Sequence, residues 1–172
     1  MARSVPDAGG VYFVPAFVGL GSPHWDMYAR GLMIGLTRGT TRAHIVRAAL
    51  ESIAYQVYDI AACMEREAGV HISVLRVDGG ASTNDFLMQF QADLLGVPVE
   101  RAMVAETTAL GAAYLAGQAM GFWRDREELI ANRKTGMRFV PRIDEKIRMK
   151  FIQGWREAGS RSAGWVNSST PS

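Results

Sequence analysis

The most constraining feature of the sequence is a series of apolar residues at helical spacing between positions 46 and 64. These residues are Val46, Leu50, Ile53, Val57, Ile60 and Met64. Their alternating intervals of four and three residues place them on one stripe of a long α-helix. Thr41 can cap the start of this helix, and Gly69 can end it in a left-handed turn. Arg47 and Glu51 lie off the stripe and four residues apart, so we expect them to pair in solvent.

A strand–turn–helix unit follows the long helix. Residues 72–77 predict a strand, residues 78–81 (Asp-Gly-Gly-Ala) predict a tight turn, and a helix is expected from about Asn84 to Leu95. Ser82 and Asp85 resemble a capping box at the start of that helix. Further strands are expected over 11–14, 32–36 and 97–101, and further helices over 107–120, 124–131 and 144–158. This alternation in the middle of the chain predicts an α/β fold.

Length, charge and cysteine content exclude several classes of protein. A chain of 172 residues predicts one domain, which we place at residues 1–158, followed by a flexible tail at 159–172. A net charge of +2 is too small for a protein that coats nucleic acid, so no nucleic-acid partner is expected. The uncharged runs are interrupted by Gly or Pro and are too short for a membrane helix. The single cysteine, Cys63, excludes a disulfide framework and fits a reducing, cytoplasmic setting.

The glycine pair Gly79-Gly80 is the sharpest candidate for a binding site. Glycines between a strand and a helix permit positive φ and leave no Cβ in the way of a bulky ligand. The helix N-terminus offers unpaired N–H donors, and the amide of Asn84 can reach the same ligand. On the motif alone an ordinary tight turn, with Asp78 accepting a backbone hydrogen bond, is the more common interpretation. The spacing matches neither the P-loop nor the dinucleotide fingerprint.

Other chemically interesting residues have simpler explanations. His24, His44 and His71 lack the spacing of a zinc pair, and one cysteine cannot complete such a site. Trp25-Asp26 suits either a sugar-binding pair or a loop anchor, and Cys63 suits a small buried side chain. The basic segment 133–150 can bind an anionic partner, but a solvated helix face is the commoner outcome.

Four stretches of the sequence carry a family resemblance. They are GGVYFVPAFVGLGSPHWD, RGLMIGLTRGTTRAHIVRAALESIAYQ, LRVDGGASTNDFLMQFQADLLGVPVER and ETTALGAAYLAGQAMGFW, which together cover most of residues 9–123. The second stretch holds the signature of the FGGY carbohydrate kinases, from Gly31 to Glu51. The chain resembles the C-terminal portion of the glycerol kinases, which belong to that family. The resemblance implies an incomplete ribonuclease H-like domain of the actin/hexokinase/Hsp70 ATPase type.

The resemblance also implies which residues meet the nucleotide. Residues 78–84 would be the adenosine motif, in which Gly80 and Asn84 contact ATP or ADP, bound with Mg²⁺, and Gly79 is the neighbouring glycine of the turn. Residues 107–117 would form a small-residue helix at the hinge between two domains. The intact enzyme would transfer the γ-phosphoryl group of ATP to glycerol, giving sn-glycerol 3-phosphate, and would be a homo-oligomer.

The family's catalytic base, glycerol-binding residues, first phosphate loop and first three strands of this domain's sheet have no match here. The resemblance therefore implies no catalytic and no metal-binding residue in this chain. We expect the chain alone to be inactive, to bind nucleotide weakly at most, and to meet glycerol only through the absent N-terminal domain. Apolar surface left uncovered near residues 72–77 would favour self-association. A kinase of another polyol or sugar, and a non-catalytic module that binds a nucleotide or a protein, remain as alternatives.

Overall fold

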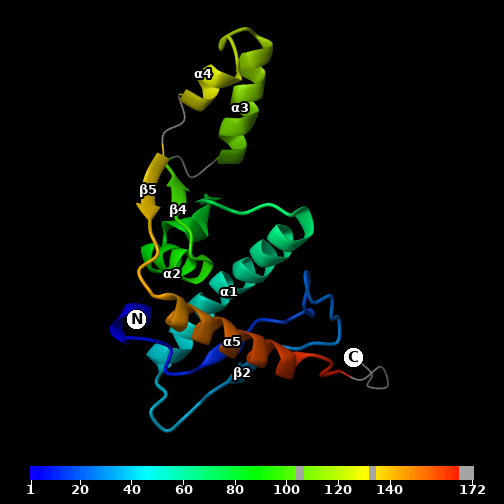
Figure 1. The fold of residues 1–172 in the computed structure, drawn as a ribbon, viewed down its shortest axis with the longest axis vertical. Coiled ribbons are helices and arrows are strands. Elements are labelled where there is room, and N and C mark those ends of the chain that lie inside the picture. Colours follow the sequence, from blue (N-terminus) through cyan, green and yellow to red (C-terminus); the bar gives the residue numbers. More distant parts are fainter. Residues whose placement is uncertain (104–106, 132–134, 167–172) are drawn as a thin grey trace.

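The computed structural model describes residues 1–103, 107–131 and 135–166 (Figure 1). Its elements in chain order are η1 (Ala2–Ser4, a 3₁₀ helix), β1 (Tyr12–Val14), β2 (Leu32–Ile34), α1 (Arg42–Ala68), β3 (Leu75–Val77), η2 (Gly80–Thr83, a 3₁₀ helix), α2 (Asp85–Leu95), β4 (Val99–Ala102), α3 (Thr107–Ala119), α4 (Arg126–Ala131), β5 (Thr135–Phe139) and α5 (Glu145–Ser162). Strands and helices alternate from α1 to α3, so the predicted α/β class is confirmed.

The strands form two small sheets. β1 and β2 pair antiparallel, and the other sheet has the order β3-β4-β5. β3 and β4 are parallel and are connected through α2, whereas β5 runs antiparallel to β4. β3 is therefore an edge strand within the described part of the chain. β5 was not predicted from the sequence, and its pairing with β4 is what defines it as a strand.

Helix α1 begins and ends where its sequence predicts. Thr41 is the N-cap, and its backbone N–H donates to Nδ1 of His44 at 3.1 Å. Gly69 ends the helix with φ 63°, a left-handed conformation that glycine adopts without steric cost. The local signals at both ends are therefore sufficient to set the length of this helix.

The face that α1 buries is not the apolar stripe. Its buried residues are Ala48, Glu51, Ser52, Ala54, Tyr55, Ala61 and Cys63. Ile60 and Met64 of the stripe are 45% and 59% exposed. The predicted Arg47–Glu51 ion pair forms at 2.8 Å, but the prediction that it lies in solvent is wrong, because the two side chains are only 14% and 7% exposed. Burial raises the pKa of Glu51, while the neighbouring guanidinium acts in the opposite direction.

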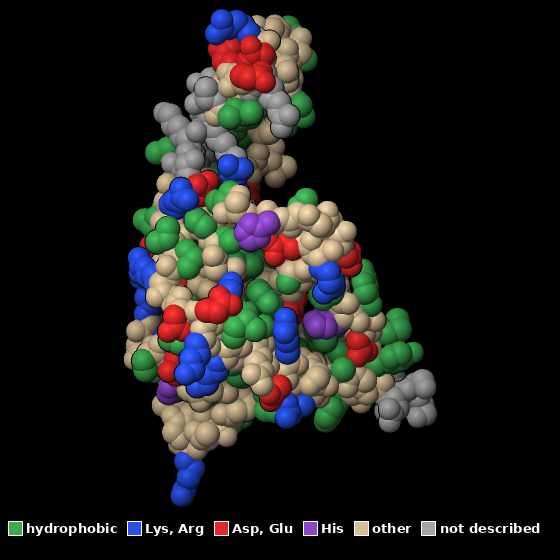
Figure 2. All heavy atoms as spheres, in the orientation of Figure 1, with side chains coloured by type: hydrophobic (Ala, Val, Ile, Leu, Met, Phe, Trp, Pro, Cys, Tyr) green, Lys and Arg blue, Asp and Glu red, His purple; other side chains and the backbone are tan. Residues whose placement is uncertain are grey.

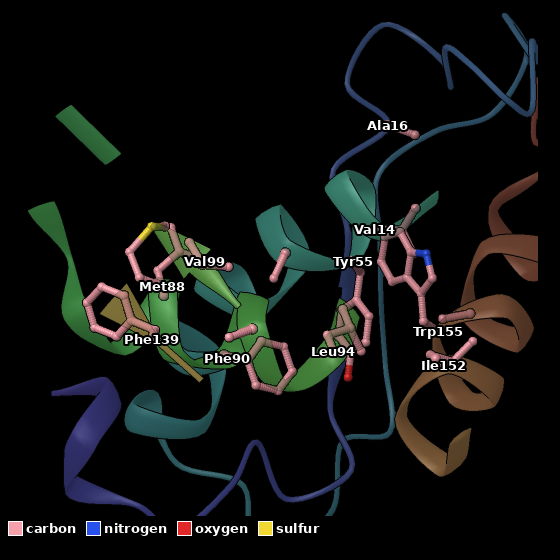
Figure 3. Packing of buried hydrophobic residues seen from close by; sticks show 14 of the residues in the cluster. Val14, Ala16, Tyr55, Met88, Phe90, Leu94, Val99, Phe139, Ile152 and Trp155 are labelled. Carbon is pink, nitrogen blue, oxygen red and sulfur yellow. The ribbon is translucent and has the colours of Figure 1, made fainter. Parts of the chain in front are cut away.

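The main core lies where α1, α2, α5 and the β1 strand meet (Figure 3). Tyr55 of α1 stacks on Trp155 of α5 with ring centroids 5.0 Å apart, and it meets Phe90 of α2 edge-on at 5.6 Å. The indole N–H of Trp155 donates to Asp59 at 2.7 Å, so its polar atom is satisfied. Such aromatic pairs add to the free energy gained from apolar burial. The core therefore fixes α2, the helix that follows the glycine turn, against α1 and α5.

The end of α5 lies beyond its predicted position. Asp144, the first residue of the predicted helix, is the N-cap and accepts from the N–H of Ile147 at 2.8 Å. The predicted end at Ala158 is wrong, because residues 159–162 form the last turn of α5. Ser162 is buried, and its carbonyl accepts from the N–H of Arg30 at 3.3 Å. Residues 167–172 of the predicted tail lie outside the described residues.

Helices α3 and α4 project from the body of the molecule as a pair (Figure 1). Within α3, no described residue is buried. The connection between the two helices packs back on α3, since Trp123 lies edge-on against Tyr114 at 5.2 Å between ring centroids and against Gly117. Figure 2 shows charged side chains together with hydrophobic ones on this projection and on the body. In the described part of the chain, no helix has both the length and the apolar character needed to cross a membrane.

Candidate functional site

The turn after β3 exposes bare backbone. Gly79 has φ 77° and ψ 178°, a conformation that an L-residue rarely adopts, so the predicted positive φ is present there. Gly80 has no positive φ, so only Gly79 uses the freedom that the glycine pair offers. A Cβ placed on either glycine would meet no heavy atom within 4 Å. The two residues therefore form an open ledge at the carboxyl end of β3, where ligands commonly bind in open α/β sheets.

Hydrogen bonds from small polar side chains set the shape of the turn. Ser82 donates from both N (3.1 Å) and Oγ (2.7 Å) to the carbonyl of Gly79, and Thr83 Oγ1 donates to the carbonyl of Gly80 at 2.7 Å. Ser82 is buried and faces the turn, so the predicted capping box with Asp85 is wrong. The same bonds leave the two glycines facing open space.

Asn84 is the N-cap of α2. Its Oδ1 accepts from the N–H groups of Phe86 (3.1 Å) and Leu87 (3.3 Å). These helix donors are therefore occupied, and the prediction that they are unpaired is wrong. Since Oδ1 serves the helix, the amide nitrogen Nδ2 is the part of this side chain that can serve a ligand. Asp78, offered by the sequence as a turn acceptor, is exposed.

Arg101 of β4 contacts the turn and was not predicted from the sequence. Its Nη1 donates to the carbonyl of Ser82 at 2.9 Å and to Oδ1 of Asp85 at 2.8 Å. The guanidinium also lies over the ring of Phe139, 5.6 Å from its centroid. Arg101 reaches the turn because it pairs with Val77, the last residue of β3, in the parallel register. No sequence pattern gives this register, so no sequence signal could have identified the contact.

Of the pair Trp25-Asp26, the aspartate anchors the loop, whereas Trp25 is 78% exposed, so the prediction that the aromatic is the anchor is wrong. Oδ1 of Asp26 accepts from the N–H groups of Tyr28 (2.8 Å) and Ala29 (3.1 Å), and Oδ2 accepts from that of Gly164 (2.8 Å). These bonds, the one from Gly164 first, lower the pKa of the Asp26 carboxyl. Both carboxylate oxygens of Asp26 are thus engaged with backbone, which gives this residue a structural role.

The histidines and the cysteine serve separate local contacts. His24 lies 3.2 Å from Asp59, His71 lies 2.9 Å from Glu65, and His44 belongs to the α1 cap. The described residues contain no group of three or more His, Cys, Asp or Glu that could hold a metal ion. Cys63 is buried, and its thiol donates to Glu67 at 3.1 Å, a bond that raises the pKa of the thiol.

The basic segment 133–150 is mostly paired or solvated. Arg138 lies 3.5 Å from Glu100, and Arg148 pairs with Glu145 while donating to the carbonyl of Leu95 at 3.1 Å. Arg133 and Lys134 lie outside the described residues. The expectation of a helix face is wrong for residues 135–139, which form β5, and holds only from Glu145, where α5 begins.

Among the described residues, hollows lie along α2 and between α1 and α5. The larger, about 560 Å³, runs along α2 from Asp85 and is lined by Arg3, Arg47 and Arg142 among others. The smaller, about 280 Å³, lies between α1 and α5 and includes His71. Neither is lined by Gly79, Gly80 or Asn84, so the predicted site is an open ledge beside the larger hollow.

Comparison with known proteins gives a consistent result. The model of the FGGY family of carbohydrate kinases, C-terminal domain, matches residues 1–120. A glycerol kinase of Pseudothermotoga lettingae is 62% identical over 166 residues, which are 96% of this chain and 33% of that protein. The chain thus spans about a third of the length of this relative.

Solved structures share the fold. The crystal structure of Plasmodium falciparum glycerol kinase with ADP is 36% identical, with a TM-score of 0.85 over 94% of this chain and 32% of that one. The ligand-bound xylulose kinase of Lactobacillus acidophilus is 26% identical, with a TM-score of 0.75 over 93% and 32%. The chain therefore has the fold of part of these sugar and polyol kinases.

Proposed function

The chain belongs to the FGGY family of carbohydrate kinases, and from this we propose that it is the nucleotide-binding part of an ATP-dependent glycerol kinase. In this proposal residues 1–158 bind the adenine nucleotide, and the phosphoryl acceptor is held by the remaining two thirds of the relatives' length. The intact enzyme transfers the γ-phosphoryl group of ATP to glycerol, giving sn-glycerol 3-phosphate.

The open ledge at Gly79-Gly80 is the observation that carries the proposal. A nucleotide can lie against these residues because no heavy atom is within 4 Å of either Cβ position. Asn84 stands at the end of the same turn, where Nδ2 can donate to a ring nitrogen or a hydroxyl of the ligand. Mg²⁺ would enter together with the nucleotide, and we assign no ligand of it to this chain.

Phosphoryl transfer depends on positioning two substrates in line and stabilising the charge between them. A ledge for one substrate supplies only half of that arrangement. We therefore propose that the chain alone catalyses no transfer. Glycerol is favoured over xylulose because the resemblance to glycerol kinases is much the stronger, in identity and in fold.

A chimera tests the proposal. This chain replaces the matching third of the Pseudothermotoga lettingae enzyme, and ADP release is measured with and without glycerol. Glycerol-dependent release is expected from the chimera and none from the chain alone. A folded chimera that releases no ADP contradicts the proposal, as does turnover by the isolated chain.

A further inference from the structure

The turn 78–84 is attached to the sheet through Arg101 of β4. Arg101 lies beside Val77, the last residue of β3, so its side chain starts at the carboxyl end of the sheet. On its other side Arg101 faces two residues of β5, Gly136 and Met137, because the β4–β5 register shifts between Glu100 and Ala102. Irregularities of this kind redirect side chains at sheet edges.

One guanidinium nitrogen connects the two elements on either side of Asn84. Nη1 of Arg101 donates to the carbonyl of Ser82 in η2 and to the carboxylate of Asp85 in α2, at 2.9 and 2.8 Å. Asp85 is 45% exposed, so the ion pair alone would contribute little. The bond to a backbone carbonyl and the packing over Phe139 hold the guanidinium in place.

The turn needs such an external attachment. Hydrogen bonds within the turn fix its shape. Glycine backbone, however, has more conformational freedom than that of any other residue, and no heavy atom packs against the Cβ positions of Gly79 and Gly80. We propose that Arg101 is a positioning residue that holds the turn 78–84 in place for the nucleotide. This inference rests on the proposed function. Arg101 contacts Ser82 and Asp85 and acts through them.

The test compares three variants of the full chain. Arg101→Met keeps the length of the side chain and removes its donors, and Arg101→Lys keeps charge and donors. Arg138→Met is the matched control, because Arg138 lies on the neighbouring strand and pairs with Glu100 at 3.5 Å, away from the turn. Backbone amide hydrogen exchange and ADP titration are both followed by NMR.

Arg101→Met is expected to speed exchange of the Ser82 and Asn84 amides about tenfold and to weaken ADP binding about tenfold, as loss of a charge-assisted hydrogen bond implies. Core amides such as that of Leu94 keep their protection. Arg101→Lys recovers most of both effects, and Arg138→Met changes neither.

Unchanged exchange and ADP affinity in Arg101→Met overturn the inference, and so does a loss of protection that extends through the core. If ADP shifts no amide of residues 78–84 when this chain is part of the chimera with the Pseudothermotoga lettingae enzyme, the proposed function fails instead. Exchange at Ser82 then still decides whether Arg101 holds the turn.

Discussion

Asn84 carries two roles that mutation can separate. Its Oδ1 caps α2 by accepting from Phe86 and Leu87, and its Nδ2 is the group proposed to meet the nucleotide. Asn84→Ala removes both roles, whereas Asn84→Ser keeps an acceptor at the cap and removes only the amide. Asn and Ser cap helices about equally well, so the serine variant isolates the ligand contact.

Loss of an N-cap costs about 1 kcal/mol, because two N–H groups at the helix start lose their acceptor. In a chain of this size that free energy lowers Tm by about 2–4 °C. Asn84→Ala is expected to show this decrease, and Asn84→Ser is expected to melt close to the unaltered chain. Both variants should bind ADP roughly three- to tenfold more weakly, the range for one neutral hydrogen bond.

Thermal unfolding by circular dichroism measures the first effect, and an ADP titration followed by NMR measures the second. Asp144→Ala is the matched control, since Asp144 caps α5 through Ile147 and lies on another element. It should lower Tm similarly and leave ADP affinity unchanged. The reasoning is refuted if Asn84→Ser binds ADP as well as the unaltered chain, or if Asn84→Ala leaves Tm unaltered.

Three further predictions concern the ledge, the exposed apolar surface and acid stability. Gly80→Val should weaken ADP binding at least tenfold in a calorimetric titration, because the valine side chain would occupy the space proposed for the ligand. Tm should change little, since a Cβ at this position meets no heavy atom within 4 Å. Undiminished affinity would place the ligand elsewhere. The chain should self-associate through the α1 stripe, and Ile60→Glu should shift sedimentation towards monomer; an identical profile argues against that surface. Asp26 has a lowered folded-state pKa, so its contribution to stability is present above the ordinary aspartate pKa and is lost as pH falls through the lowered value. Asp26→Asn should therefore flatten the dependence of Tm on pH below about 4, and an unchanged acid limb would contradict the assignment.

The extent of α1 could be predicted because its signals are local. A threonine cap, a terminal glycine and a regular apolar spacing are all contained in the segment itself. Which face would be buried could not be predicted in this way. Tyr55 packs against α2 and α5, and the side that it shares with Glu51 is buried, so the neighbours decide the outcome. The spacing of apolar residues shows that a helix is amphipathic, but it does not show which elements pack against the helix.

The candidate site shows the same division. Gly79 with positive φ and Asn84 at the start of α2 follow from strand, turn and helix signals. Arg101 and β5 do not, because both depend on pairing between strands distant in the sequence. The wrong capping box arose because Ser82 and Asn84 are both good cap residues two positions apart, and only the turn geometry shows that Ser82 is used by Gly79.

The segment that contains α3 and α4 connects two neighbouring strands, β4 and β5. Ala102 closes β4 and pairs with Thr135, where β5 opens, so the excursion between them starts and finishes at the same rung of one ladder. The sheet register therefore does not depend on how long that excursion is. The segment between β4 and β5 can therefore tolerate insertions and deletions, as the tip of a hairpin does. The hydrogen bonds between β4 and β5 would be kept.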